Sequence, residues 1–196
     1  MIGRDGYMIP KKIHYCWFGK GKKSKLALKC IRSWRQYCPE YEVIEWNEEN
    51  FDIDMNGYTR MCYAEKKYAY LSDYVRLWVV EKYGGIYFDT DVEVIRSLEE
   101  LLRNDAFFCF ENKQYVASGL GFGSVAHGKV IQAMLKEYEI LLDGKNGVRM
   151  CPKLNTQALV ALGLKQNGRK QNVCEAVIYP MDVLNPYNSA TGKLEK

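Results

Sequence analysis

The chain has 196 residues, of which 47% are hydrophobic, and a formal net charge of +4 at pH 7. This length suffices to bury a sizeable core, and no apolar run approaches the roughly 20 residues that a bilayer-crossing helix needs. Residues 1–10 lack the apolar stretch of a secretory signal. These features argue against a membrane-spanning protein, and we expect a single α/β domain over residues 1–196, located in the cytoplasm.

The charge is unevenly distributed, because residues 11–35 are almost purely basic and residues 40–54 are almost purely acidic. This asymmetry argues against a nucleic-acid partner. The basic segment could face a diphosphate, a phosphate-bearing lipid acceptor or the inner face of an anionic membrane. The alternative is a solvated helix face that carries Lys22, Lys23, Lys25 and Lys29.

Seven cysteines are scattered along the chain without a Cys-x-x-Cys pair, and only two histidines are present. This pattern does not favour a zinc site or a disulfide framework. We therefore expect reduced, mostly buried thiols.

The first third of the chain predicts a β-α-β unit. Residues 12–18 are rich in aromatic and β-branched residues, which predicts a strand that ends near Trp17. Apolar residues at helical spacing follow the capping residue Ser24 and continue to residue 37, and residues 41–46 predict a second strand. This opening is typical of nucleotide-binding α/β sheets, which bind ligands at the carboxyl ends of their strands.

A second helix is predicted over residues 68–82, ended by Gly84 and Gly85. A strand over residues 86–88 then runs directly into Asp89-Thr90-Asp91. The remaining predictions are extended chain at 92–95, helices at 98–102, 130–142 and 156–164, strands at 106–110 and 177–179, and a bent loop at 119–124.

Asp89 and Asp91 are the candidate metal ligands. In extended backbone, side chains two residues apart point the same way, so both carboxylates would reach one point while Thr90 faces the other side. Two hard oxygen ligands suit Mg²⁺ or Mn²⁺, with phosphate oxygens and water completing the shell.

The Asp-x-Asp motif also occurs in other kinds of site. A calcium loop beginning at Asp89 is rejected, because Val94 stands where a glycine must allow the sharp turn. A phosphohydrolase of the aspartyl-phosphate type stays open as an alternative, although it normally has a threonine where this chain has Glu93. A non-catalytic domain that binds a nucleotide sugar is the third alternative.

Three motifs in order carry a family resemblance: Ile-Pro-Lys-Lys-Ile-His-Tyr-Cys-Trp at 9–17, Leu-Ser-Asp-Tyr-Val-Arg at 71–76, and Tyr-Gly-Gly-Ile-Tyr-Phe-Asp-Thr-Asp at 83–91. Together they resemble glycosyltransferase family 32, whose bacterial capsular polysaccharide members look most similar. The likeness runs from about residue 9 to about residue 184.

The resemblance implies a GT-A-like nucleotide-sugar-binding fold, a single Rossmann-like mixed sheet flanked by helices. It implies a hexosyltransferase that uses Mn²⁺ or Mg²⁺ and a nucleotide-diphosphate sugar, with UDP as the expected nucleotide. The sugar would pass with retention to a saccharide or lipid-linked oligosaccharide acceptor, in surface or capsular polysaccharide synthesis.

The resemblance also implies roles for individual residues. Asp89 and Asp91 would hold the metal, and Asp89 would also contact the donor. Asp73 and Arg76, three apart on one helix face, would jointly reach the donor sugar, although a local ion pair is the structural alternative.

Three further donor contacts are implied. Trp17 would stack on the donor base, with core packing as its alternative. Tyr87 shares a strand face with Asp89 and would place its hydroxyl near the donor, with burial in the sheet as its alternative. Asn47 would contact the nucleoside, although forming a turn is the expected role of an asparagine there.

Two expectations concern the second half of the chain. Cys151-Pro152 stands where family members usually carry a small residue before proline in an acceptor-side loop. After residues 185–192, family members continue into a segment with histidine and tryptophan that closes over the donor. That segment is absent from this sequence, so we expect an open site that binds donor weakly.

Overall fold

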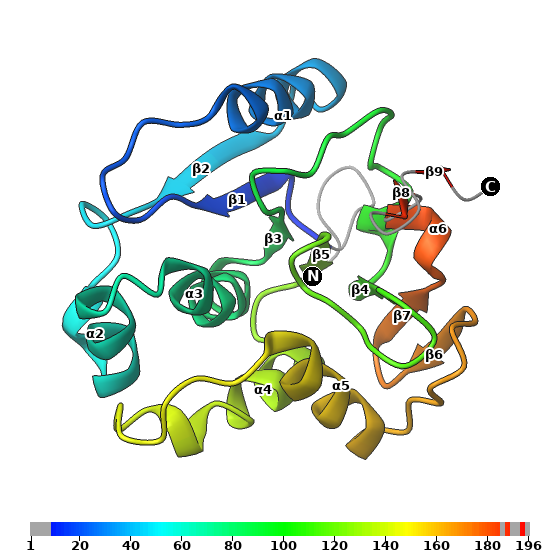
Figure 1. Cartoon of the computed structure of the whole chain (residues 1–196). Helices are drawn as coiled ribbons and strands as arrows, with labels where there is room; N and C mark the ends of the chain where they lie inside the picture. The colour runs from blue at the N-terminus through cyan, green and yellow to red at the C-terminus, as the bar shows by residue number, and fades with distance from the viewer. Residues whose placement is uncertain (1–8, 185–186, 189–192, 195–196) are drawn as a thin grey trace.

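The structure is a computed structural model that describes residues 9–184, 187–188 and 193–194. Most of residues 185–192, after which family members continue into the closing segment, lie outside the described residues. Figure 1 shows one mixed sheet with helices on both faces. Its strands are β1 (Lys12–Cys16), β2 (Glu42–Trp46), β3 (Gly85–Tyr87), β4 (Ala106–Cys109), β5 (Phe122–Ser124), β6 (Gln171–Val173) and β7 (Ala176–Tyr179).

The strand order in the sheet is β2-β1-β3-β5-β4-β7-β6. β1 pairs in parallel with β2 and with β3, and β4 pairs in parallel with β7, whereas β5 and β6 run antiparallel to their neighbours. A separate two-stranded pair joins β8 (Tyr187–Asn188) and β9 (Lys193–Leu194). The predicted α/β fold with a single mixed sheet is confirmed.

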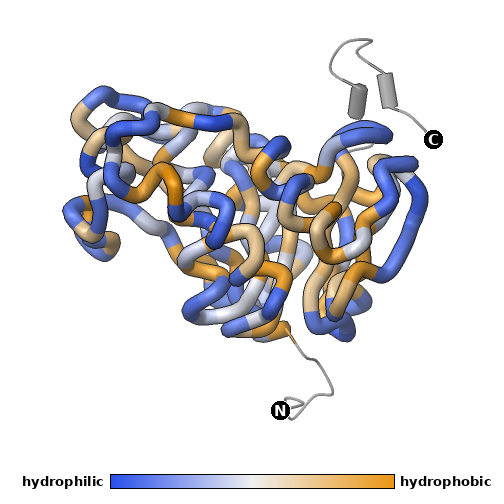
Figure 2. Tube along the Cα trace, turned by 90° about the horizontal axis from the view of Figure 1, so that it is seen from below, coloured by the Kyte–Doolittle hydropathy of each residue, from blue (hydrophilic) through white to orange (hydrophobic). Residues whose placement is uncertain are grey.

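Helices cover both faces of the sheet. The α-helices are α1 (Lys25–Tyr37), α2 (Gly57–Ala64), α3 (Tyr68–Tyr83), α4 (Lys129–Lys136), α5 (Cys151–Ala161) and α6 (Met181–Leu184), and the 3₁₀ turns are η1 (Ile53–Met55), η2 (Leu101–Arg103) and η3 (Glu139–Leu141). α1 covers one face, and α2 to α5 cover the other (Figure 1). The apolar segments run through the interior between these layers, as the hydropathy colouring in Figure 2 shows.

α1 makes contacts that hold the segment after the Asp-x-Asp motif in place. The Ser24 hydroxyl accepts a hydrogen bond from the Ala27 amide at 3.1 Å, which caps the helix as predicted. Trp34 is fully buried against the Phe88 ring, and its indole N–H donates to the Val92 carbonyl at 2.8 Å. The helix thus holds the chain on both sides of residues 89–91.

Several predicted boundaries differ from the structure. Residues 92–95 were expected to be extended but form no strand. The predicted helix at 98–102 is helical only in part, where it forms the 3₁₀ turn η2. The predicted helix at 130–142 is divided into α4 and η3. α5 begins at Cys151, five residues before the predicted start at Thr156, because proline fits the first turn of a helix and Pro152 occupies it. The predictions also missed η1, α2, α6 and β6, and the pair of β8 and β9.

The expectation of a bent loop over residues 119–124 was wrong for its second half, which forms β5. A β-carbon on Gly123 would lie 2.5 Å from the Phe107 ring of the neighbouring strand. The absence of a side chain on Gly123 therefore allows β5 to form here, although the glycine-rich composition of residues 119–124 is typical of a loop.

Two further findings bear on the sequence expectations. All seven cysteines are free, and all except Cys174 are buried, which confirms the expected buried thiols. Among the helices that the structure describes, none is both long enough and apolar enough to cross a membrane.

His14 joins β1 to the turn before β3. Its buried ring donates from Nε2 to the Gly84 carbonyl at 2.9 Å and accepts at Nδ1 from the Trp46 indole N–H at 3.1 Å. This pairing requires the neutral ring, and burial lowers the pKa of His14 to about 4, below its ordinary value of about 6.5.

Acid should therefore weaken the fold through His14. Between pH 6.5 and pH 4 the unfolded chain binds a proton that the folded chain excludes, so stability present above pH 6.5 is lost as the pH falls. We expect a loss of about 2–3 kcal/mol in the free energy of unfolding across this window. Urea unfolding from pH 7 to pH 5 should show a shallower pH dependence in His14→Gln than in the wild type; equal slopes would assign the loss to other groups.

Candidate functional site

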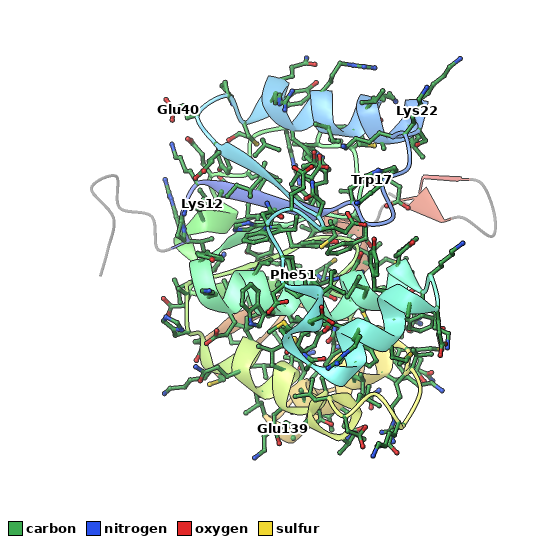
Figure 3. All side chains as sticks on the ribbon, turned by 90° about the vertical axis from the view of Figure 1, so that its left-hand side faces the viewer. Lys12, Trp17, Lys22, Glu40, Phe51 and Glu139 are labelled. Atoms are coloured by element: carbon green, nitrogen blue, oxygen red, sulfur yellow. The ribbon has the colours of Figure 1, made fainter. Side chains whose placement is uncertain are left out.

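The candidate site lies at the carboxyl ends of β1 and β3. A cavity of about 330 Å³ opens there, lined by Cys16, Trp17, Phe18, Tyr68, Ala69, Ser72, Arg76, Tyr87, Asp89, Thr90 and Asp91. In Figure 3, Trp17 and Lys22 lie at this end of the molecule, and Lys12 and Glu40 lie at the opposite end. The position agrees with the general rule that α/β sheets bind ligands at the carboxyl ends of their strands.

The turn between α3 and β3 brings Arg76 and Asp89 together. Gly84 and Gly85 have positive φ angles of 63° and 111°, which let the chain leave the helix and enter the strand at once. Arg76 lies eight residues before Gly84, about 12 Å along a helix, and Asp89 lies four residues after Gly85, about 13 Å along extended chain. Because these lengths match, the two side chains end side by side.

Arg76 is the centre of the polar contacts in the site. Its guanidinium donates to Asp73 Oδ1 at 2.6 Å from Nη2, lies 3.4 Å from Asp89 Oδ2 through Nη1, and donates from Nε to the Ser72 carbonyl at 3.2 Å. It also lies over the Tyr87 ring, 5.0 Å from the ring centroid. Burial alone would lower the pKa of Arg76, but the charges of Asp89 and Asp73 raise it well above its ordinary value.

Asp73 and Arg76 form the local ion pair that the sequence offered as the structural alternative. The pair is largely buried, because the two side chains are only 16% and 5% exposed. Burial raises the pKa of Asp73, and the charge of Arg76 opposes that rise. An exposed pair would contribute little to stability, but a buried pair cannot lose one partner cheaply.

The backbone of the Asp-x-Asp motif departs from the extended geometry that was expected. The Val92 amide donates to the Asp89 carbonyl at 3.1 Å, which closes a turn over residues 89–92. The alternation that placed Thr90 on the opposite side therefore does not apply, and Thr90 lines the cavity together with both aspartates. Asp89 and Asp91 thus line the same cavity, but from a turn and not from an extended strand.

The two aspartates differ in environment. The Asp89 side chain is 36% exposed, Asp91 is exposed at the surface, and Asp89 Oδ1 accepts a hydrogen bond from the Tyr87 hydroxyl at 3.0 Å. Burial of its carboxylate raises the pKa of Asp89, while Arg76 and Tyr87 oppose the rise. Tyr87 is 1% exposed, so it is buried in the sheet and also orients the carboxylate.

Trp17 lies between two cavities. It follows β1, its indole N–H donates to the Gly21 carbonyl at 2.7 Å, and the Lys23 ammonium lies 5.5 Å from its ring centroid. One side lines the cavity described above, and Trp17 also lines a second cavity of about 360 Å³ with Lys20, Gly21, Lys23, Glu45, Asn47, Glu48 and Glu49. Trp17 is partly exposed, and its buried part packs against the core cluster on the α1 face of the sheet.

Asn47 forms a turn, as the structural alternative predicted. Its side-chain oxygen accepts from the Glu49 amide at 2.8 Å, and its side-chain nitrogen donates to Glu45 Oε1 at 3.2 Å. It also lines the second cavity beside Trp17. The turn and a place in the cavity are therefore compatible.

Sequence reasoning missed Gly119 as a site residue. Its carbonyl accepts from the Asp89 amide at 3.2 Å, and a β-carbon added to it would lie 2.4 Å from Asp89 Oδ2 and 2.9 Å from Arg76 Nη1. The three glycines at 119, 121 and 123 were a visible signal, but they match no phosphate-binding motif. Gly119 packs closely against Asp89 and Arg76, whereas Gly121 and Gly123 pack against the rings of Phe88 and Phe107.

Gly119→Ala should disrupt the site without requiring a strained backbone. The added methyl group would push Asp89 away from Arg76, and a misplacement of about 1 Å can lower turnover by about a hundredfold. Gly147→Asn is the control, because open space surrounds Gly147 and asparagine tolerates its positive φ of 66°. Initial rates of Gly119→Ala and Gly147→Asn test this prediction. Equal rates for the two variants would contradict it, because they would show that Asp89 can move aside without loss of turnover.

The aspartates suit a cation that is shared with a substrate. Among the described residues, no three His, Cys, Asp or Glu side chains gather closely enough to hold a metal ion. Asp89 and Asp91 supply hard carboxylate oxygens, the donor type that Mg²⁺ prefers, and Mg²⁺ usually binds through one or two carboxylates plus substrate phosphates. These residues therefore fit a divalent cation whose shell a diphosphate completes.

Comparisons with known proteins agree with this geometry. Residues 24–108 match the family model described as the glycosyltransferase sugar-binding region containing the DXD motif. Inositol phosphoceramide mannosyltransferase 3 of Schizosaccharomyces pombe is 32% identical over 106 residues, which cover 50% of this chain and 29% of that protein. The chain thus spans less than a third of the length of this relative.

Two solved structures share the fold. PaToxG glycosyltransferase aligns with a TM-score of 0.62 at 18% identity, covering 78% of this chain and 68% of that chain. The UDP-bound glycosyltransferase domain of the YGT toxin aligns with a TM-score of 0.53 at 11% identity, covering 82% and 69%. The chain therefore has the fold of the GT-A glycosyltransferases, and the match over residues 24–108 supports a transferase of the kind that carries a DXD motif.

Proposed function

We propose that this protein is a metal-dependent glycosyltransferase that moves a hexose from a UDP-sugar to a saccharide or lipid-linked acceptor. The observation that carries the proposal is the placement of Arg76 between Asp73 and Asp89 in a cavity that Trp17 and Asp91 also line. The family match over residues 24–108 and the UDP-bound state of a neighbour with the same fold support it.

Each group has a role in this proposal. Asp89 and Asp91 hold Mn²⁺ or Mg²⁺, and Trp17 stacks on the donor base. The bound cation supplies Lewis-acid stabilisation of the charge that develops on the leaving nucleoside diphosphate. Tyr87 keeps the Asp89 carboxylate oriented through their hydrogen bond.

Arg76 supplies a fixed positive charge in the site. Its side chain is 5% exposed and is held by two carboxylates, so it does not need to reorganise when charge develops on the donor. Asp73 fixes the guanidinium and, with it, positions the donor sugar. The resemblance to glycosyltransferase family 32 further suggests transfer with retention, by attack of the acceptor hydroxyl on the face that the diphosphate leaves.

We place the enzyme in capsular or surface polysaccharide synthesis, at the cytoplasmic face of the membrane. α1 supports a peripheral membrane contact, because it has no acidic residue and exposes Leu26 and Leu28 beside Lys25 and Lys29.

A donor panel tests the proposed reaction. The protein is incubated with UDP- and GDP-sugars and Mn²⁺, and the release of nucleoside diphosphate is measured with and without a metal chelator. We expect one UDP-sugar to be consumed, and the chelator to stop its consumption. Release of inorganic phosphate would instead indicate an aspartyl-phosphate-type phosphohydrolase, and binding without turnover would indicate a non-catalytic nucleotide-sugar-binding domain.

A further inference from the structure

A carboxylate at the end of β2 gathers three side chains beside Trp17. Glu45 accepts hydrogen bonds from the Tyr15 hydroxyl and, at 3.2 Å, from the Asn47 side-chain nitrogen, and the Lys23 ammonium lies 2.7 Å from its Oε2. Tyr15 and Glu45 are partners in the parallel pairing of β1 and β2. Burial would raise the pKa of Glu45, but the hydrogen bonds from its three partners lower it below its ordinary value. Glu45 is therefore an anion fixed at the rim of the second cavity.

The loop between β1 and α1 folds back onto the Trp17 ring. The indole N–H of Trp17 donates to the Gly21 carbonyl at 2.7 Å, and the Lys23 ammonium, two residues farther on, lies 5.5 Å from the ring centroid. A cation at this distance is attracted to the face of an aromatic ring, more strongly where it is shielded from water. The side chains of Lys23 and Glu45 are 23% and 27% exposed, so the pair is better shielded than an ordinary surface pair.

The contacts of Trp17 leave one part of its ring for a ligand. Its buried part packs against the core cluster on the α1 face of the sheet. Lys23 meets the ring from the second cavity and does not line the first, whereas Trp17 lines both. The core and the ammonium therefore hold the ring, while another part of it faces the cavity that Arg76 and Asp89 line.

We propose that Lys23, anchored by Glu45, is a positioning residue for donor binding: its ammonium holds the Trp17 ring in the orientation that stacks on the donor base. This inference rests on the proposed function, in which Trp17 makes that contact. It also gives part of the basic segment a role. The sequence offered a diphosphate or a solvated helix face for Lys23, whereas Lys23 precedes α1 and pairs with Glu45.

Two substitutions of Lys23 test this role. Lys23→Met removes the ammonium and keeps an unbranched side chain, whereas Lys23→Arg keeps a cation that pairs with carboxylates and stacks on aromatic rings. Calorimetry with UDP and with GDP, each with Mn²⁺, identifies the nucleotide that the wild type binds more tightly. We expect Lys23→Met to weaken that affinity about fivefold, as loss of a partly shielded cation–π contact would, and Lys23→Arg to stay within about twofold. With an active donor sugar, the loss should appear in KM and leave kcat nearly unchanged.

Two further measurements show whether Lys23 acts through the ring. In a Trp17→Leu background, Lys23→Met should change the affinity by less than about twofold, because the ring on which the ammonium acts is gone. The NMR signal of the Trp17 indole N–H, identified by its absence from Trp17→Leu, should move farther in Lys23→Met than in Lys23→Arg. If Lys23→Met does not fold, Glu45→Gln takes its place, with an expected loss of about threefold because the anchor of the ammonium is weakened.

Lys12→Met is the matched control. Lys12 pairs with Glu42 at 3.9 Å across the same two strands, at the end of the sheet opposite Trp17 (Figure 3). Its loss removes the same charge and an ion pair between the same elements, so it should change neither the nucleotide affinity nor the Trp17 signal.

The outcomes distinguish this inference from the proposed function. If the wild type binds UDP or GDP, an unchanged affinity in Lys23→Met, or equal losses in Lys23→Met and Lys23→Arg, would overturn the positioning role while the transferase proposal stands. A loss that persists in the Trp17→Leu background would also overturn it, because Lys23 would then act on the nucleotide directly. A wild type that neither binds UDP or GDP nor consumes a sugar of the donor panel would overturn the proposed function and this inference with it.

Discussion

Asp91→Asn is expected to lower turnover by at least about a hundredfold while leaving the fold unchanged. Asp91 is exposed and makes no ion pair among the described residues, so its loss should shift the melting temperature by less than about 2 °C. In the proposed site, however, its carboxylate is one of two that the protein offers the cation. Loss of several kcal/mol of charge stabilisation corresponds to a hundredfold or more in rate.

Asp89→Asn should also abolish turnover, with an added effect on stability. Asp89 contacts Arg76 and accepts a hydrogen bond from Tyr87, so the amide would leave part of the positive charge of the guanidinium unmatched. Glu93→Gln is the control, an exposed acid two residues after Asp91 that pairs with Lys29. Initial rates at saturating donor and Mn²⁺ test the assignment of both aspartates as metal ligands. Activity above a tenth of the wild-type value in both Asp89→Asn and Asp91→Asn would contradict that assignment.

Arg76→Ala is expected to damage both the rate and the fold. Removing the guanidinium leaves Asp73 without the partner at 2.6 Å and Asp89 without the partner at 3.4 Å. Breaking a buried pair by removing one partner costs about 3–5 kcal/mol, which corresponds to roughly 6 °C or more in melting temperature. A low rate in this variant alone would therefore not show a catalytic role.

Arg76→Lys separates the two effects. Lysine keeps the positive charge, but it cannot place donors toward Asp73, Asp89 and the Ser72 carbonyl at once. We expect turnover to fall at least about tenfold, with less than half of the stability loss of Arg76→Ala. Urea unfolding and initial rates on the same preparations provide the comparison. Full activity in Arg76→Lys would mean that the site needs only a charge at this position, and loss of activity in proportion to stability would assign Arg76 a structural role alone.

The fold was predictable where local signals agreed. Ser24 capped α1 as expected, and the glycine pair at 84 and 85 ended α3 and began β3. The glycine pair brings Arg76 and Asp89 together, and the family resemblance supplied the donor-binding roles that remain proposals for these residues. Tyr87 and Asp89 were also correctly assigned to one face, as their hydrogen bond shows.

What could not be predicted depends on contacts between distant segments. The turn at residues 89–92 forms where the sequence reads as extended chain, and Trp34 of α1 holds its end through the Val92 carbonyl. Gly119 lies against Asp89 only because β5, which follows it in the sequence, pairs with β3 in the folded chain. The burial of Arg76 has the same origin, and no pattern in residues 68–83 announces it.

Calorimetric titration with UDP, with and without Mn²⁺, tests the central claim most directly. Two carboxylates leave most positions of the cation shell to the diphosphate, so the metal and the nucleotide should each bind weakly alone and strengthen each other by the same factor. We predict that Mn²⁺ raises the affinity of the wild type for UDP at least about tenfold, and that the increase disappears in Asp91→Asn. An affinity for UDP that does not change with Mn²⁺, or an equal increase in Asp91→Asn, would contradict a metal held by Asp89 and Asp91 on the donor diphosphate.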